Sequence, residues 1–350
     1  MNKKLIASAM GLVMAGGMGL ANADVQIGGQ IDLSLLATDS DAAGFEDDVN
    51  MHSQNSAVFI KGSEDLGNGL SAFFHLEYES DISNGGDFGT GRDQFVGLKM
   101  ESFGKLAFGT NSTAYKSPGS KIDPFYRTPL QSRDIGLQSN LHSGKGEEGQ
   151  GRGTNMVRYD SPSLGGLSLT ATYQFDDSKA DGEDDDPYSL GITYKGGGLY
   201  AAASYIDTQG ADDAGAYQIL ARYDIADFSI HGIYEFDDGL ISAQRSNGFT
   251  DNNGGRAGSA QDTGGDIWSV GATYSIGNNL VAFDYGYGAD SDGKDGVGGT
   301  ADDIEEYDVW RIGAYHSFSK RTRVYAGYAN TDYEDKGEDE RIALGIRHNF

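Results

Sequence analysis

The chain contains no cysteine, which excludes a disulfide framework, a thiolate metal site and a thiol nucleophile. It contains only 5 prolines, and after residue 23 no stretch approaches the roughly 18 consecutive apolar residues of a membrane-spanning helix. Basic residues are scarce as well, because 26 Lys and Arg face 53 Asp and Glu, for a net charge of −27. So acidic a chain is a poor partner for nucleic acid.

Catalytic signatures are also missing. The 6 histidines are scattered, and neither a G-x-S-x-G elbow nor an H-E-x-x-H pair occurs. We therefore expect no enzyme and no resident cofactor. Two acidic tracts, Asp181 to Asp186 and Asp290 to Gly296, superficially resemble calcium loops. In the second tract Lys294 takes the fifth position and Asp295 stands where glycine is required, so solvated loop charge is favoured over a metal site.

The first 23 residues have the pattern of an export signal. Lys3 and Lys4 precede an apolar segment that runs to Leu20, and Ala21 to Ala23 supply the small-x-small pattern of a cleavage site. The alternative, a membrane anchor, is disfavoured because the segment is short and interrupted by glycines. We expect a signal peptide over residues 1–23 and a single domain over residues 24–350. Without Lys3 and Lys4 the net charge would be −29.

The rest of the chain alternates between apolar and polar residues. Leu167 to Phe175 and Trp268 to Ile276 alternate at every step, as strands with one apolar and one polar face do. The chain is rich in Gly, Tyr and Phe (53, 20 and 16 residues), so disorder is disfavoured. A soluble sandwich would alternate in the same way, so alternation alone leaves the fold class open.

The connections favour a transmembrane barrel. Sixteen strand-like segments can be placed, beginning near Val25, Ser56, Gly69, Asp93, Gly104, Thr154, Leu167, Pro187, Leu199, Ala216, Phe228, Ile267, Asn279, Tyr307, Thr322 and Arg341. Every second connection is short, and those between are long and polar. We therefore predict an all-β fold: a transmembrane antiparallel β-barrel of 16 strands with short periplasmic turns and long extracellular loops.

Two further features agree with that fold. Aromatic residues gather towards the strand ends on the apolar parity, where membrane interfaces would lie; they include Tyr159, Tyr173, Trp268, Tyr285 and Trp310. The last strand alternates from Ile342 to Phe350, and Phe350 is the final residue. A terminal strand ending in Phe is the assembly signal of outer-membrane barrels, and we assign that role to Phe350.

Three stretches resemble the general diffusion porins of proteobacteria, a family of trimeric sixteen-stranded barrels in the outer membrane of Gram-negative bacteria. They are Ile60 to Glu77, the hairpin of Val96 to Leu98 with Phe103 to Gly109, and Asn155 to Pro162. The resemblance implies a water-filled channel for passive diffusion of ions and small hydrophilic solutes, a homotrimer, and contact with lipopolysaccharide and outer-membrane lipids. Divalent cations bridging the acidic loops to lipopolysaccharide are compatible with it. A structural or adhesive barrel, or a barrel enzyme, is the alternative, and single-channel conductance would discriminate them.

The longest connection, residues 111–153, follows the fifth strand, where porins fold a loop into the lumen. The resemblance and the strand parity place four basic residues beside this constriction loop: Lys61, Arg92, Arg152 and Arg158. Asp123 and Asp134 are the acids expected on the opposing loop, with weaker expectations for Glu147 and Glu148. Opposed rows of charge across a narrow opening would set ion selectivity.

Overall fold

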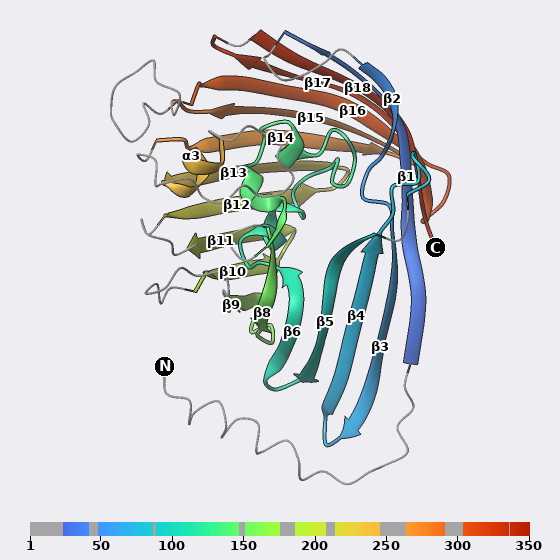
Figure 1. Ribbon diagram of the computed structural model, residues 1–350, viewed down its shortest axis with the longest axis vertical. Helices are drawn as coiled ribbons and strands as arrows, with labels where there is room; N and C mark the ends of the chain where they lie inside the picture. Colours follow the sequence, from blue (N-terminus) through green and yellow to red (C-terminus); the bar gives the residue numbers. More distant parts are fainter. Residues whose placement is uncertain are drawn as a thin grey trace.

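The computed structural model describes residues 24–41, 48–86, 89–146, 151–175, 186–207, 214–245, 264–290, 304–335 and 337–350. The predicted signal peptide, the greater part of both acidic tracts, Glu147 and Glu148 lie outside these ranges. The described chain is almost entirely β-structure arranged as a ring (Figure 1). None of its helices is long and apolar enough to cross a membrane.

The strands are β1 (Asp24–Ser40), β2 (Asp48–Ser53), β3 (Ala57–Gly67), β4 (Leu70–Glu79), β5 (Thr90–Met100), β6 (Gly104–Ser112), β7 (Lys145–Gly146), β8 (Arg152–Asp160), β9 (Leu167–Gln174), β10 (Tyr188–Gly196), β11 (Leu199–Asp207), β12 (Gly215–Ile225), β13 (Phe228–Asp238), β14 (Ile267–Ile276), β15 (Asn279–Gly288), β16 (Tyr307–Ser317), β17 (Thr322–Tyr333) and β18 (Gly337–Asn349). The helical turns are α2 (Lys116–Gly119), η1 (Ser132–Asp134), η2 (Asn140–His142) and α3 (Leu240–Arg245).

These strands form a closed antiparallel barrel with sixteen strands in its wall. β2 and β3 are two pieces of one wall strand, since both pair with β1, and they are interrupted at residues 54–56, where Asn55 has a φ of 54°. β7 is a two-residue pairing beside β8 rather than a wall strand. The other edge of β1 pairs with β18, from Gln30 opposite Asn349 to Ser40 opposite Asp339. First and last strands therefore close the ring, which leaves no open sheet edge.

The predicted segregation of the connections is confirmed. One end of the barrel carries tight turns such as 197–198, 226–227 and 277–278, whereas the connections at the other end are long. We call these the short-turn end and the long-loop end. Glycines with positive φ occupy the tight turns, as at Gly197 and Gly277, because few other residues adopt this conformation without strain.

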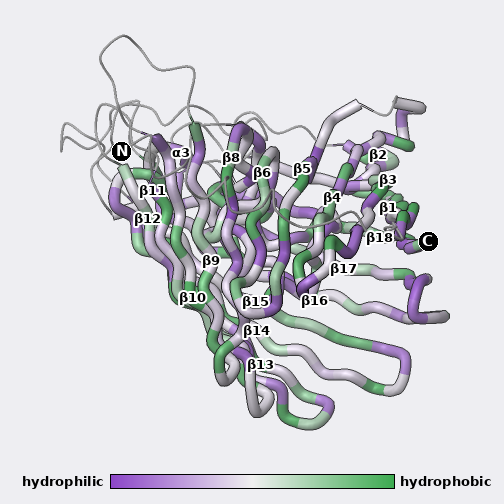
Figure 2. The backbone as a smooth tube through the Cα atoms, turned by 90° about the horizontal axis from the view of Figure 1, so that it is seen from below, coloured by the Kyte–Doolittle hydropathy of each residue, from purple (hydrophilic) through white to green (hydrophobic). Residues whose placement is uncertain are grey.

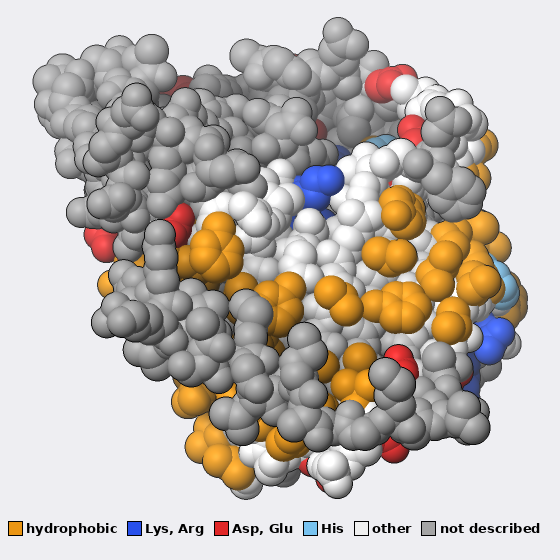
Figure 3. All heavy atoms as spheres, turned by 60° about the horizontal axis from the view of Figure 1, so that its bottom comes forward, with side chains coloured by type: hydrophobic (Ala, Val, Ile, Leu, Met, Phe, Trp, Pro, Cys, Tyr) orange, Lys and Arg blue, Asp and Glu red, His pale blue; other side chains and the backbone are white. Residues whose placement is uncertain are grey.

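The outer face of the barrel is apolar and exposed. Along β16 alternate residues are buried and exposed, and the exposed set includes Trp310 and Ile312. Leu344 and Ile346 on β18 are 58% and 48% exposed. Figure 2 shows hydrophobic and hydrophilic positions alternating along the strands, and Figure 3 shows hydrophobic side chains gathered in patches on one face. In water so much exposed apolar surface would be unfavourable, but lipid would cover it.

Aromatic pairs mark both ends of this outer face. At the long-loop end the rings of Tyr205 and Tyr217 lie 4.5 Å apart, and those of Trp310 and Tyr328 lie 5.0 Å apart. At the short-turn end the Tyr159 hydroxyl donates a hydrogen bond of 2.7 Å to the carbonyl oxygen of Phe103. These are the positions of aromatic girdles at two membrane interfaces.

The packed core lies inside the barrel, between the wall and the connection from β6 to β8. This connection, residues 113–151, is called the inward loop below. Figure 1 shows its helical turns within the ring of strands. Phe125, Leu130 and Leu137 of the inward loop are at most 1% exposed and pack against wall residues such as Tyr307 and Val309. The interior is therefore partly filled by protein.

Candidate functional site: a basic constriction in the barrel lumen

The inward loop is held where it leaves the wall. The Arg158 guanidinium on β8 donates hydrogen bonds to the carbonyl oxygen of Ser112, at 2.6 Å, and to Oγ of Ser117, at 2.9 Å. Asp160 two residues further along the same face pairs with Arg158 at 2.8 Å. Because alternate residues of a strand point to the same face, Arg158 and Asp160 both face the lumen. The contacts of Arg158 hold the start of the inward loop there, and Asp160 holds the Arg158 side chain in place.

One carboxylate on the opposite wall binds the far side of the inward loop. Glu235 of β13 is fully buried and accepts hydrogen bonds from the Tyr115 hydroxyl at 2.9 Å and from His142 Nε2 at 3.0 Å. It also accepts from the backbone N–H and the hydroxyl of Ser139, at 2.8 and 2.6 Å. A buried carboxylate needs this number of donors, so the inward loop and Glu235 stabilise each other.

A second anchor lies on β16. Arg311 is fully buried, and its guanidinium pairs with Asp123 of the inward loop at 3.1 Å and with Asp284 of β15 at 2.8 Å. The same group donates to the carbonyl oxygen of Leu130 and stacks on the Phe125 ring, 4.7 Å from its centroid. The charges of Asp123 and Arg311 therefore compensate each other beneath the loop.

Glycines on the lumen face of the wall make room for the apolar side chains of the inward loop. A Cβ atom at Gly313 of β16 would overlap the Phe125 ring, and one at Gly327 of β17 would lie 2.6 Å from Cδ1 of Leu130. Real Cβ atoms do not approach so closely, because the van der Waals repulsion is steep. The two glycines form sockets into which the loop fits.

The space that remains beside the inward loop is a cavity of about 560 Å³, called the constriction cavity below. Among the residues that the structure describes, six basic and two acidic side chains line it. The basic residues are Arg92, Lys116, Arg133, Lys145, Arg152 and Arg341, and the acidic residues are Glu79 and Asp134. The opening thus has an excess of positive charge within a chain that is strongly negative.

Carboxylates fix the two wall arginines of the constriction cavity. Arg92 pairs with Glu77 at 2.9 Å and with Glu79, and Arg152 pairs with Asp93 at 2.6 Å. Both arginines are nearly buried, at 4% and 6% exposed. Pairing of this kind holds a guanidinium in one orientation and lowers its freedom to move with a passing solute.

The positive charge also acts on two residues of the inward loop. Burial, together with the nearby cations Arg152, Arg133 and Arg92, lowers the pKa of the Lys116 ammonium well below its ordinary value. Burial alone would raise the pKa of the Tyr126 phenol, but the surrounding guanidinium groups, Arg133 foremost, lower it. Because the Tyr126 shift opposes the effect of burial, it indicates a positive local potential.

The structure brings some of the predicted site residues together and separates others. Arg92, Arg152 and Asp134 line the constriction cavity. Arg158 holds the start of the inward loop, as described above, and Lys61 is exposed with its Nζ over the Phe59 ring, 5.0 Å from the centroid. Asp123 is only 8% exposed and is bound by Arg311.

Several residues of the cavity were not predicted from the sequence. Lys116, Arg133 and Lys145 lie on or beside irregular segments of the inward loop, where no strand parity indicates which way a side chain points. Arg341 lies near the start of β18, on the parity of the lumen-facing Arg347. Alternation could therefore have predicted that Arg341 faces the lumen, but not which residues surround it there.

A closed barrel of sixteen wall strands with an apolar outer face, segregated loops and a lumen narrowed by an inward loop is an outer-membrane channel. A sequence model of the family described as "Gram-negative porin" matches residues 7–336, so the chain belongs to this family. It is a porin of the outer membrane, a water-filled channel for passive diffusion, and not an enzyme.

Individual relatives agree with this assignment. The major outer membrane protein P.IB of Neisseria meningitidis is 32% identical over 314 residues, covering 84% of this chain and 83% of the relative. An outer membrane porin protein of Bordetella pertussis is 26% identical over 397 residues and the full length of both chains. Among solved structures, an anion-selective porin from Comamonas acidovorans has a TM-score of 0.73 at 20% identity, covering 94% of this chain and all of the other. OmpF of Salmonella typhi, in a complex with daunomycin, has a TM-score of 0.69 at 18% identity, covering 93% and 97%.

Proposed function

We propose that the constriction cavity selects among the solutes that diffuse through this porin, and that it favours small hydrophilic anions. Arg92 and Arg152 form the wall side, and Lys116 and Arg133 approach from the inward loop. The observation that supports this proposal most strongly is the excess of basic over acidic side chains among the described residues that line the cavity, six to two. Fixed cations at a narrow opening lower the electrostatic barrier for anions and raise it for cations.

Asp134 is the acidic residue that we propose for the loop side of the opening. Its carboxylate accepts hydrogen bonds from the side-chain amides of Gln54, at 2.9 Å, and Gln131, at 2.7 Å. These neutral contacts orient the group, and Nε of Arg133 lies 3.8 Å from its Oδ1. For Asp123 and Arg158 we propose a positioning role, because their partners hold the inward loop in place. Lys61 would contribute charge further along the lumen.

Salt concentration should decide how strongly the acidic remainder of the chain opposes this preference. At about 0.1 M salt the Debye length is roughly 10 Å, so acidic groups around the mouth still attract cations. At about 1 M it falls to roughly 3 Å, and only the charges that line the opening act on the ion. The anion preference should therefore be clearest at high salt, with a shift towards cations at low salt.

Reversal potentials in a KCl gradient test the proposal. Replacing Arg92 and Arg152 with Ser should shift the reversal potential towards cation preference at both salt concentrations and raise the conductance. Replacing Asp134 with Ser should shift it towards anions. Lys99→Ser with Lys105→Ser, which do not line the constriction cavity, changes the net charge equally and serves as the control. Unchanged reversal potentials in the first pair would contradict the assignment.

We also propose that the porin is a homotrimer. The apolar outer faces of β1 and β18 support this, since Ile27, Leu35 and Leu344 are 72%, 51% and 58% exposed beside the barrel closure. A structural neighbour, OmpT of Vibrio cholerae, is described as a trimer form. Light scattering of the detergent-solubilised protein, corrected for bound detergent, should give three copies, and a monomer at all protein concentrations would contradict the proposal.

Contact with lipopolysaccharide is proposed on the same outer surface, with divalent cations bridging acidic loops to its anionic groups. The excess of acidic residues and the aromatic girdle at the long-loop end support it. Extraction of the protein from membranes with and without EDTA tests it. Equal retention of lipopolysaccharide after both treatments would exclude a cation bridge.

For residues 1–23 we propose a signal peptide that is removed after Ala23. The basic start, the apolar segment and the small-x-small pattern support it. Sequencing the N-terminus of the protein from outer membranes should give Asp24 as the first residue.

A further inference from the structure

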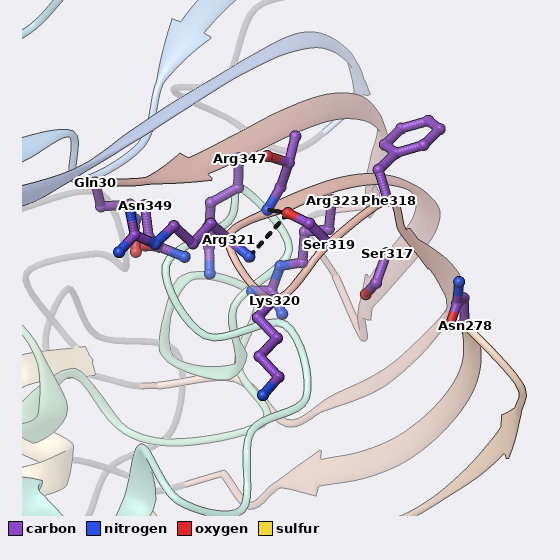
Figure 4. A pocket seen from close by; sticks show the side chains of 11 residues that line it. Gln30, Asn278, Ser317, Phe318, Ser319, Lys320, Arg321, Arg323, Arg347 and Asn349 are labelled. Carbon is purple, nitrogen blue, oxygen red and sulfur yellow. Dashed lines mark hydrogen bonds between the residues drawn. The ribbon is translucent and has the colours of Figure 1, made fainter.

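A second cavity, of about 440 Å³, opens at the short-turn end of the barrel, which faces the periplasm. It lies between the turn that joins β16 to β17 and the ends of β18 and β1, and we call it the periplasmic cavity (Figure 4). It shares no lining residue with the constriction cavity. Its volume is within the range of small-ligand sites, which is roughly 300–1,000 Å³.

Among the described residues, four cationic side chains and no acidic one line the periplasmic cavity. The cations are Lys320, Arg321, Arg323 and Arg347. Arg347 pairs with Asp32 at 2.7 Å, but the described part of the chain provides no ion pair for the other three. In a chain with twice as many acidic as basic residues, uncompensated positive charge at one place is a strong local exception.

Arg323 is held in place by an aromatic ring instead of a carboxylate. Its guanidinium lies over the ring of Tyr315, 4.4 Å from the centroid, and the Tyr315 hydroxyl donates a hydrogen bond of 2.6 Å to the carbonyl oxygen of Pro124. Stacking orients the planar group while leaving its N–H donors available to an anion. The site is therefore organised before a ligand binds.

Two buried donors at the periplasmic cavity lack an acceptor within the described residues. They are Nε of Arg323 and Nε2 of Gln30. A buried donor without a partner costs roughly 1–3 kcal/mol, and a ligand oxygen would relieve that cost. The side chains of Asn278, Asn349 and Ser317 add neutral donors around the same space.

We propose that the periplasmic cavity binds a phosphate group. Cations converge on it from the β16–β17 turn and from strands β17 and β18. A phosphate uses donors from several directions: a soluble phosphate monoester has roughly two negative charges and three acceptor oxygens, and the phosphodiester of a lipid headgroup has one charge and two non-bridging oxygens. A carboxylate would use one guanidinium fork and leave the other cations uncompensated. The phosphate belongs either to a solute that enters from the periplasm or to the headgroup of an inner-leaflet phospholipid. For the second source, Phe318, which is 64% exposed and points away from the cavity, would offer an apolar contact to the lipid beside the cations.

Planar bilayers of a phosphate-free galactolipid, bathed in KCl, test the soluble source. Inorganic phosphate added to the chamber facing the periplasmic end should reduce the chloride current at a concentration at least fivefold lower than phosphate added to the other chamber. The triple variant Lys320→Gln, Arg321→Gln, Arg323→Gln should lose this asymmetry. The matched control Lys99→Gln, Lys105→Gln, Lys195→Gln removes three exposed charges from β5, β6 and β10 and should retain it.

Phospholipid retained after extensive detergent washing tests the headgroup source. Wild-type protein and the control variant should then carry more lipid phosphorus than the Lys320, Arg321, Arg323 variant. Open-channel conductance of each variant verifies that the barrel has folded. If the triple variant matches the wild-type protein both in the phosphate response and in retained phospholipid, the periplasmic cavity is not a phosphate site.

Discussion

Arg311 of β16 and Asp123 of the inward loop form an ion pair of 3.1 Å in which neither side chain is more than 2% exposed. The pair joins residues on opposite sides of the packed interface between loop and wall. Burying two charges is expensive unless hydrogen bonds satisfy both, and here Asp123 also accepts the backbone N–H groups of Phe125 and Ser132, at 2.9 and 2.8 Å. The position of the constriction therefore depends on residues that no solute contacts.

Replacing Asp123 with Asn should loosen the inward loop. Arg311 would keep Asp284 but lose one of its two buried carboxylate partners, which costs roughly 1–3 kcal/mol. We expect a higher open-channel conductance with more current noise in single-channel recordings. Asp134→Asn, which removes the same charge from the opening, should change the reversal potential with little added noise. The opposite distribution of effects would contradict the roles proposed for these two residues.

Replacing Glu235 with Gln should detach the other side of the inward loop. An amide presents one acceptor oxygen and one donor group, so it cannot accept all the hydrogen bonds from Tyr115, Ser139 and His142. We expect the folded band on a mild detergent gel to be lost at a lower temperature than in the wild-type protein. Glu101→Gln in an exposed turn is the control, and an equal shift there would contradict the assignment.

The lowered pKa of Lys116 predicts a pH-dependent selectivity. A lysine with a lowered pKa loses its proton at a lower pH than the ordinary value of about 10.4, so the positive charge of the opening should fall as the pH rises. Ionisation of Tyr126, whose pKa is also lowered, acts in the same direction. Reversal potentials measured at increasing pH values below about 10.4 should show a declining anion preference.

Two variants separate the two groups. Lys116→Gln should begin with a weaker anion preference and change less over this range, whereas Tyr126→Phe should keep the part of the change that comes from Lys116. An identical pH profile in the wild-type protein and in both variants would show that neither group titrates in the opening.

The closure between the first and last strands predicts a role for Phe350 in assembly. Its backbone exchanges two hydrogen bonds of 3.1 Å with Gly29, and a Cβ atom at Gly29 would lie 2.5 Å from Cζ of its ring. Deleting Phe350 should lower the amount of folded protein in the outer membrane severalfold. Phe350→Tyr should restore it. Normal amounts of the deletion variant would show that the terminal ring is dispensable.

The sequence was sufficient to predict the barrel because its signals are local. Alternation predicts which face of each strand is apolar. The alternation of short and long connections predicts at which end of the barrel each connection lies. Simple alternation fails only where a strand is irregular. Counted back from the lumen-facing Phe95, Arg92 would point outward, but the shift in register between the pairs of Leu76 and Tyr78 turns it into the lumen. The strand parity used in the sequence analysis therefore placed Arg92 in the lumen without accounting for this shift, whereas the resemblance to porins did not depend on it.

The inward loop could not be predicted to the same depth. Lys116 and Arg133 lie on the short helical turns α2 and η1. The placement of these turns depends on contacts that Tyr115 and Asp123 make with strands more than 90 residues further along the chain. Asp123 and Asp134 illustrate the consequence. Both are acids of the same loop, and only the position of Arg311 beneath the loop distinguishes the buried residue from the one at the opening.

The glycine sockets of the wall have an evolutionary consequence. Because Phe125 and Leu130 rest on Gly313 and Gly327, a methyl group added at either glycine would lift the loop from its support and push it towards Arg92 and Arg152. The bore of the channel can thus be narrowed by a single substitution behind the loop, while every charge in the passage is retained. Pore width and pore charge can therefore change independently of each other by mutation.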